Sequence, residues 1–167
     1  MQTDAIVRDL LDQDAEVQSA LREHWHGTVF RSDGTVDRNE IAKKVFGNKA
    51  ELNWLESLLH PRVRNAWETA LVKSPDLRWL VEIPLLFEKK LETKFDSTIC
   101  IACTPVVVNK RMVSRGYSLS EIDKRRQWQM SLEEKVCRSD YVITNSGSIE
   151  FLKLQIKRLI KEIEQLT

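Results

Sequence analysis

The sequence is poor in the features that mark several common classes of protein. Three cysteines in 167 residues give neither a disulfide framework nor a zinc-binding pattern. No apolar run approaches the roughly 20 residues of a membrane-spanning helix, and the N-terminus is neither basic nor apolar enough for a signal peptide. The formal net charge of +1 indicates no nucleic-acid partner and no anionic membrane. We therefore expect a globular, cytoplasmic protein.

Two of the cysteines, Cys100 and Cys103, have C-x-x-C spacing, which is found in redox pairs. They lie in the apolar run Ser97-Thr-Ile-Cys-Ile-Ala-Cys103, whereas activation of a thiolate needs a polar setting. We interpret both as buried, small apolar residues in a reducing cytosol.

Glycine is also scarce. The five glycines, at positions 27, 34, 47, 116 and 147, form no Gly-x-x-x-x-Gly-Lys-[Ser/Thr] loop. Such a loop cradles nucleotide phosphates with its backbone amides and binds the β- and γ-phosphates through its lysine. The printed sequence therefore contains no phosphate-binding loop of this kind.

Three apolar runs are predicted to be strands: 79–83, 97–103 and 141–144. Each is continuously apolar rather than alternating, which is typical of parallel strands covered on both faces. Helical patterns separate them, so the sequence predicts an α/β fold with a parallel sheet. Residues 14–72 hold no strand pattern and are expected to form a helical subdomain inserted into a single domain, 1–167.

Several local signals mark helices. Asp37 and Glu40, and then Ser118 and Glu121, have the spacing of capping boxes, and Thr104-Pro105 is typical of a helix start. One helix is expected before His60-Pro61 and another after it. A stripe at helical spacing ends the chain: Leu152, Ile156, Leu159, Ile160, Ile163 and Leu166.

Candidate functional residues follow the predicted strands, because ligands of open α/β sheets bind at the carboxyl ends of strands. This rule indicates the extreme N-terminus, Pro84 to Glu88, Thr104 onward, and Asn145. Arg111 and Arg115 are four residues apart, so one helix face presents both guanidinium groups, which suits a transferring phosphoryl group. A solvated helix face is the alternative, and for Lys124-Arg-Arg126 we prefer it.

The segment Glu82-Ile-Pro-Leu-Leu-Phe-Glu88 resembles the Asp-Ile-Pro-Leu-Leu-Phe-Glu segment of dephospho-coenzyme A kinases. Asp33-Gly-Thr-Val-Asp-Arg38, the helix-breaking pair His60-Pro61, and Asp140-Tyr-Val-Ile-Thr-Asn145 are similar to further patterns of that family, in the same order. The resemblance covers essentially the whole chain. It implies that His60, Pro84, Leu85, Leu86, Phe87 and Glu88 border the acceptor site and that Asn145 contacts the nucleotide base.

The N-terminal segment Gln2-Thr-Asp-Ala-Ile-Val-Arg8 resembles the family's Asp-Ala-Asp-x-Ile-x-Arg, which ends a strand and begins a helix. Asp4 falls on the second Asp, and the resemblance implies that it is the general base for the ribose 3′-hydroxyl and that Arg8 binds substrate. Without the resemblance, Asp4 would be interpreted as a helix N-cap. Gln2 departs from the pattern, which weakens any magnesium or substrate contact at that position.

The resemblance implies a P-loop kinase-like fold in which Arg111 and Arg115, in a lid region over about residues 105–138, stabilise the transferring phosphoryl group. The family's first strand, phosphate loop and first helix have no counterpart in the printed sequence, so we expect the chain to be truncated, through a misassigned start, a shortened clone or a genuine short paralogue. The missing strand should leave apolar sheet edges uncovered, and turnover should fall at least about a thousandfold.

The expected reaction is ATP-dependent phosphorylation of dephospho-coenzyme A to coenzyme A, the last step of coenzyme A synthesis, with ATP and Mg²⁺ required; no protein-bound metal site is expected. One alternative is an impaired form that only binds coenzyme A or its precursor, which an assay of ATP consumption would separate. Another is a nucleic-acid binder that uses Lys110, Arg111 and 124–126, which the net charge and the absence of interleaved aromatics disfavour. The sequence does not predict an oligomeric state.

Overall fold

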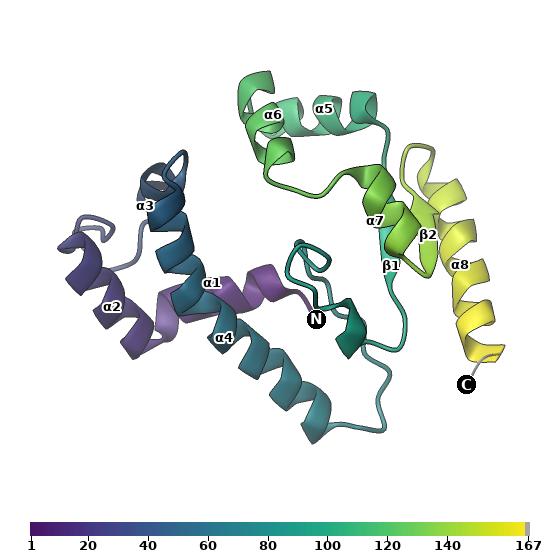
Figure 1. Ribbon diagram of the computed structural model, residues 1–167, viewed down its shortest axis with the longest axis horizontal. Helices are drawn as coiled ribbons and strands as arrows, with labels where there is room; N and C mark the ends of the chain where they lie inside the picture. The colour runs from purple at the N-terminus through teal and green to yellow at the C-terminus, as the bar shows by residue number, and fades with distance from the viewer. Residues whose placement is uncertain (166–167) are drawn as a thin grey trace. The chain divides into compact units, whose positions relative to one another are not determined.

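The computed structural model describes residues 1–165 (Figure 1). The chain divides into two compact units, residues 1–84 and residues from 85 onward, and each is described by itself. The boundary follows Pro84, within the segment that carries the strongest resemblance. This division does not test the helical subdomain expected at 14–72 or the lid region expected at about 105–138, so both remain predictions.

The first unit consists of four helices: α1 (Thr3–Gln13), α2 (Ala15–Trp25), α3 (Arg38–Val45) and α4 (Lys49–Lys73). Asp14, Asp37 and Asn48 cap the last three, each accepting hydrogen bonds from two backbone N–H groups of the first turn. The capping function predicted for Asp37 is confirmed. The helices enclose one apolar core, formed by Leu11, Val17, Leu21, Trp25, Val29, Val36, Ile41 and Leu59.

A tight turn at 31–35 connects this core to α3. Phe30 and Val36 form an antiparallel bridge, and Gly34 has a φ of 83°, a conformation that glycine adopts without steric cost. The Asp33 carboxylate accepts hydrogen bonds from the hydroxyl and the N–H of Thr35, which hold its pKa below the ordinary value. The Asp-Gly-Thr-Val-Asp-Arg motif therefore shapes a turn and starts a helix.

The prediction that His60-Pro61 breaks a helix is wrong. Pro61 lies inside the 25-residue helix α4. Pro61 has no N–H to donate to the carbonyl of Ser57, four residues earlier. The neighbouring Leu58 carbonyl accepts a hydrogen bond from Arg62 Nη1 at 2.9 Å. Leu59 and Trp67, on either side of the proline, are both buried, so packing holds the helix together through this point.

The predicted strand at 79–83 is also wrong in extent. Only Glu82 pairs, in an isolated parallel bridge with Gln2. The Glu82 N–H donates to the Met1 carbonyl at 2.8 Å, and the Thr3 N–H donates to the Glu82 carbonyl at 3.2 Å. Helix α1 starts at Thr3, so the pairing cannot continue beyond this residue. The bridge nevertheless places the start of α1 beside the segment that leads to Pro84.

The second unit contains a short 3₁₀ turn, η1 (Glu92–Lys94), and a two-stranded parallel sheet of β1 (Ile99–Ala102) and β2 (Tyr141–Thr144). The other elements are helices: α5 (Pro105–Ser114), α6 (Leu119–Gln127), α7 (Leu132–Arg138) and α8 (Ile149–Gln165). Thr104 precedes Pro105 at the start of α5, and Ser118 forms the predicted capping box at α6. The α/β class, the parallel pairing and these two strands are confirmed.

Asp140 holds the two strands in register at their amino ends. Its carboxylate accepts two hydrogen bonds from Thr98, through the hydroxyl and the backbone N–H, each at 2.7 Å. These bonds hold the pKa of Asp140 below its ordinary value. The pairing then runs from Ile99 opposite Tyr141 to Ala102 opposite Thr144, so both strands end at the same edge.

The expectation that both faces of the sheet are covered is met only in part. Helix α7 packs on β1 and α8 packs on β2. Cys100 is buried on one strand and Ile143 on the other, but Ile101 is 56% exposed and Val142 41% exposed. Successive residues of a strand point to opposite faces, so within residues 85–165 each face is covered over only one of its two strands.

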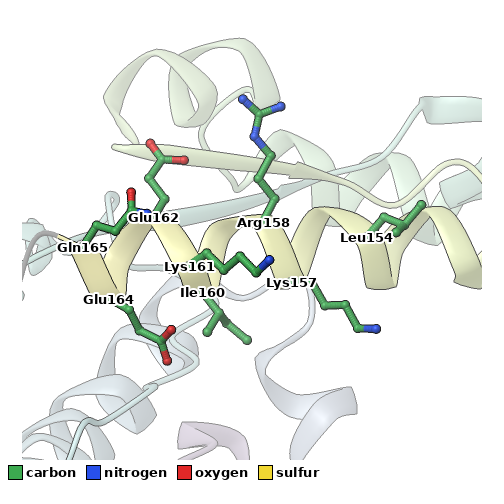
Figure 2. A pocket seen from close by; sticks show the side chains of 8 residues that line it. All are labelled: Leu154, Lys157, Arg158, Ile160, Lys161, Glu162, Glu164 and Gln165. Carbon is green, nitrogen blue, oxygen red and sulfur yellow. The ribbon is translucent and has the colours of Figure 1, made fainter.

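Helix α8 confirms the predicted terminal helix, although Leu166 lies outside the described residues. Leu152, Leu159 and Ile163 are half-buried, whereas Ile156 and Ile160 are exposed. An open depression runs along this helix, and Figure 2 shows that the eight side chains lining it all come from α8. It is therefore a helix surface rather than a cavity enclosed by several elements. No helix among residues 1–165 is both long and apolar enough to cross a membrane.

Candidate active site

The candidate residues fall into two groups, one in each unit. In the first unit, Asp4 lies in the first turn of α1 and its side chain is exposed. The N-cap of this helix is Gln2, not Asp4, so the N-cap interpretation of Asp4 is wrong. Arg8 is one turn further along α1 and therefore shares a face with Asp4. The carboxylate of Asp4 accepts no hydrogen bond from the described residues, which leaves it available to a ligand.

His60 belongs to the same unit. Its Nε2 lies 4.0 Å from Glu56 Oε1, one turn earlier on α4, and its side chain is 46% exposed. Helix α1 packs against α4, so the helix that carries Asp4 and the helix that carries His60 are neighbours in one core.

In the second unit, Leu85 to Lys90 fold into a series of tight turns. The Lys89 N–H donates to the Leu85 carbonyl at 3.1 Å, and the Leu91 N–H donates to the Leu86 carbonyl at 3.0 Å. Phe87 is 6% exposed, so this aromatic ring anchors the segment. Pro84, at the end of the first unit, is exposed, and Leu85 and Leu86 are half-buried.

Arg111 and Asn145 are brought together at the carboxyl ends of β1 and β2, where the sequence analysis expected a ligand. Arg111 Nη1 donates to the Asn145 carbonyl at 2.9 Å, and Nη2 lies 3.4 Å from Asn145 Oδ1. The Asn145 N–H in turn donates to the Ala102 carbonyl at 2.7 Å, continuing the ladder of the sheet. Both side chains of this pair are therefore fixed to the strand ends.

Ser146 and Cys103 complete this cluster, and sequence reasoning did not identify them. The Ser146 hydroxyl accepts a hydrogen bond from the Thr104 N–H at 2.9 Å, which ties the loop after β2 to the start of α5. Cys103 Sγ lies 3.7 Å from Arg111 Nη1 and 3.4 Å from the Asn145 carbonyl. In two of these contacts the partners are 42 residues apart, so no local spacing could have indicated the cluster.

The two cysteines thus differ. Cys100 is buried as predicted, and burial raises the pKa of its thiol, which makes it unreactive. Cys103 is only half-buried, which corrects the expectation that both are core residues. Its exposure results from its place at the strand end, where the polar loops meet.

The other basic residues of this region have different surroundings. Arg115 is the C-terminal cap of α5, and its exposed guanidinium has no polar partner among residues 85–165. Arg126 bonds Asp123 and Asn109, while the guanidinium of Arg125 lies over the ring of Tyr117. Both arginines are exposed and contact residues of α5, α6 and the turn between these helices, which agrees with the solvated helix face preferred for 124–126.

Glu88, at the end of the segment expected to border the acceptor site, is largely enclosed. Its side chain is 16% exposed, and Oε1 accepts hydrogen bonds from Lys135 Nζ at 2.9 Å and from the Met130 N–H at 2.8 Å. Burial alone would raise the pKa of this carboxyl, but the hydrogen bonds from Lys135 and the backbone hold it below its ordinary value. Sequence analysis missed Lys135, which lies 47 positions away.

Comparisons with known proteins show which family this chain is similar to. The family model for dephospho-CoA kinase matches residues 1–150. A dephospho-CoA kinase of Bacillus cereus (strain ATCC 10987 / NRS 248) is 33% identical over 162 residues, covering 95% of this chain and 81% of the relative. One from Carboxydothermus hydrogenoformans is 34% identical over 163 residues, covering 95% and 79%.

Solved structures show the same similarity. A Thermus thermophilus protein superposes with a TM-score of 0.76 at 30% identity, over 97% of this chain and 83% of that one. Dephospho-CoA kinase from Campylobacter jejuni gives a TM-score of 0.69 at 25% identity, over 99% and 84%.

Fold, site and comparisons together define a class, the α/β phosphotransferases with a P-loop kinase fold. Within that class, the chain belongs to the dephospho-CoA kinase family. The matches leave about a fifth of each curated relative's length without a counterpart in this sequence.

Proposed function

We propose that this chain transfers the γ-phosphoryl group of ATP to the ribose 3′-hydroxyl of dephospho-coenzyme A, yielding coenzyme A and ADP, and that it does so in the cytoplasm. The observation that carries the assignment of roles is the meeting of Arg111 with Asn145 at the carboxyl ends of β1 and β2. Nucleotides bind at this edge of α/β sheets. Family membership supplies the substrate class.

The Asp4 carboxylate would accept the proton of the ribose 3′-hydroxyl as the 3′-oxygen attacks the γ-phosphorus of ATP. The bond between the γ-phosphorus and the oxygen of the leaving ADP would break. The exposed position of Asp4 in the first turn of α1 and its lack of a polar partner among residues 1–165 support this role. Arg8, on the same helix face, would bind the acceptor. His60 and the segment from Pro84 to Phe87 would border the acceptor site.

Arg111 and Arg115 would contribute in different ways. Asn145 would contact the base, and Arg111, bonded to Asn145, would bind the nucleotide from that side. To reach the transferring phosphoryl group, Arg111 would give up its hydrogen bonds to Asn145 and Cys103, whereas Arg115 has no polar partner among residues 85–165 to give up. Arg115 is therefore the stronger candidate for neutralising the charge that develops on the phosphoryl oxygens.

Magnesium would arrive as its complex with ATP. Within residues 1–165, no three metal-ligating side chains gather, so these residues provide no protein cage for a metal ion. Mg²⁺ is usually held by substrate phosphates with one or two carboxylates, which is compatible with such a site. When bound, the ion would neutralise charge on the β- and γ-phosphates.

Consumption of ATP that depends on dephospho-coenzyme A tests this proposal. We expect ADP to form only when the acceptor is present, and coenzyme A, which already carries the 3′-phosphate, not to replace it. Binding of dephospho-coenzyme A without any ADP formation would favour the alternative of a binding module. Retention on DNA that weakens with salt would favour a nucleic-acid binder.

A further inference from the structure

Two ion pairs connect the segment that follows Pro84 to helix α7, in the second unit. Glu88 pairs with Lys135, and Glu92, one turn later, pairs with Arg138. Lys135 and Arg138 are three residues apart on α7 and thus share one face. The guanidinium of Arg138 also lies over the ring of Phe87, 5.1 Å from its centroid.

The Glu88–Lys135 pair is unusually enclosed for charged groups, whereas in the second pair Arg138 is 39% exposed. The side chains of Glu88 and Lys135 are 16% and 17% exposed. The second carboxylate oxygens, Glu88 Oε2 and Glu92 Oε2, are buried and have no hydrogen-bond partner among the described residues. Burying charge in this way is a poor source of stability, because desolvation offsets the attraction. The pairs do, however, fix the geometry of the groups that they join.

The joined groups are the segment expected to border the acceptor site and the start of α7. Glu88 Oε1 accepts from the Met130 N–H, directly before the Ser131 cap of α7. Helix α7 packs on β1, while α5 and α6 pack on each other. The pairs therefore fasten Leu85–Phe87 to a helix that rests on the sheet.

We propose that Glu88, through Lys135, is a positioning residue that holds the acceptor segment Leu85–Phe87 on helix α7, rather than a residue that touches the substrate. This inference rests on the proposed function. Glu92 and Arg138 act in the same direction, one turn away.

Substitutions on both sides of the pair distinguish positioning from direct contact. We expect Glu88→Gln and Lys135→Met each to raise the KM and Kd for dephospho-coenzyme A about tenfold to a hundredfold, since a small misplacement of a binding segment has effects of this size. The KM for ATP should change little. Lys135→Arg should stay near wild type, because it keeps the positive charge that pairs with Glu88. Glu133→Gln, an exposed acid on α7, is the matched control.

Direct contact predicts a different pattern. If Glu88 bound the substrate itself, Lys135→Met would leave the KM and Kd for dephospho-coenzyme A unchanged. That result overturns the proposal.

Hydrogen exchange tests the proposal without substrate. Glu88→Gln and Lys135→Met should speed exchange of the Met130 amide and of amides in 85–91, while amides of β2 stay protected. Unchanged exchange of the Met130 amide and of the amides in 85–91 contradicts the proposed attachment of Leu85–Phe87 to α7, even if the wild-type protein fails to bind dephospho-coenzyme A. That failure would count against the proposed function instead.

Discussion

Asp4 is the residue on which the chemistry depends most. The family resemblance implied a general base at this position, whereas the residue taken without the resemblance indicated a helix N-cap. In the structure Gln2 occupies the cap position and makes no side-chain capping bond. Asp4 is thus not used for capping, and its exposed carboxylate remains available for proton transfer.

Asp4→Asn should lower turnover by about 10²–10⁴, the usual contribution of a general base. The Kd for dephospho-coenzyme A should change little, because Asn keeps the shape and one acceptor. Rates and binding are measured on the same preparation, with Asp9→Asn as the control: it removes another exposed carboxylate of α1. Equal rates in Asp4→Asn and wild type would show that Asp4 is not the general base.

The two arginines should separate kinetically. Arg115→Ala should lower kcat by about 10²–10³, the cost of removing one charge-stabilising donor, with little effect on the KM for ATP. Arg111→Ala should raise the KM for ATP, because it also frees Asn145 from its bond at the strand end. Steady-state kinetics with varied ATP tests this split. If Arg111→Ala instead lowered kcat and Arg115→Ala raised the KM for ATP, Arg111 would have to leave Asn145 during the reaction.

At the scale of elements, the helices and strands that depend on local signals were predictable. Asp37, Ser118 and Thr104-Pro105 start helices, and 141–144 forms a strand, because caps and apolar runs act within a few residues. The continuation of α4 through Pro61 and the lack of a full strand at 79–83 were not predictable, because tertiary packing decides both. Buried Leu59 and Trp67 carry α4 through its proline, and 79–83 has only the residues at Met1–Thr3 to pair with.

Contacts between distant elements were equally unpredictable. Glu51 on α4 accepts hydrogen bonds from His24 Nε2 at 2.8 Å and Trp25 Nε1 at 2.7 Å, on α2. The ring of His24 stacks on that of Trp54, with centroids 3.7 Å apart. The bonds from His24 and Trp25, and the charge of Lys44, hold the pKa of Glu51 below its ordinary value.

This lowered pKa fixes the sign of a pH effect. The folded protein binds the Glu51 proton more weakly than the unfolded chain, so the stabilisation is present above the unfolded pKa and is lost as pH falls through the folded one. Glu51→Gln should therefore lower the Tm at about pH 5.5, and the difference from wild type should shrink toward about pH 3.5. Thermal melts of both proteins, with exposed Glu23→Gln as control, test this. A difference that grows on acidification would contradict it.

At the scale of the whole molecule, the sequence predicted the fold class and the family, but it predicted the site only as a set of segments. Order along the chain was enough to identify strand ends and the Pro-Leu-Leu-Phe-Glu segment. It could not show that Arg111 binds Asn145, or that both oxygens of Glu88 are enclosed beside Lys135. Such contacts join residues more than 30 positions apart, and only the folded chain defines them.

The rate is a separate question at this scale from the identity of the reaction. The printed sequence holds no glycine-rich phosphate loop, and backbone amides of such loops position the triphosphate. The residues proposed to bind the acceptor, to accept the proton and to contact the nucleotide base do not belong to such a loop. Slow formation of coenzyme A would therefore agree with the proposed roles. The identity of the product, and not the rate at which it forms, tests these roles.

The position of the phosphate on the product tests the central claim most directly. The protein is incubated with dephospho-coenzyme A, magnesium and ATP, and the product is examined by mass spectrometry and by ³¹P nuclear magnetic resonance. The account predicts coenzyme A, with its new phosphate on the ribose 3′-oxygen, and its loss in Asp4→Asn. A phosphate on another atom, or no product beyond the protein-free control while dephospho-coenzyme A binds, would contradict it.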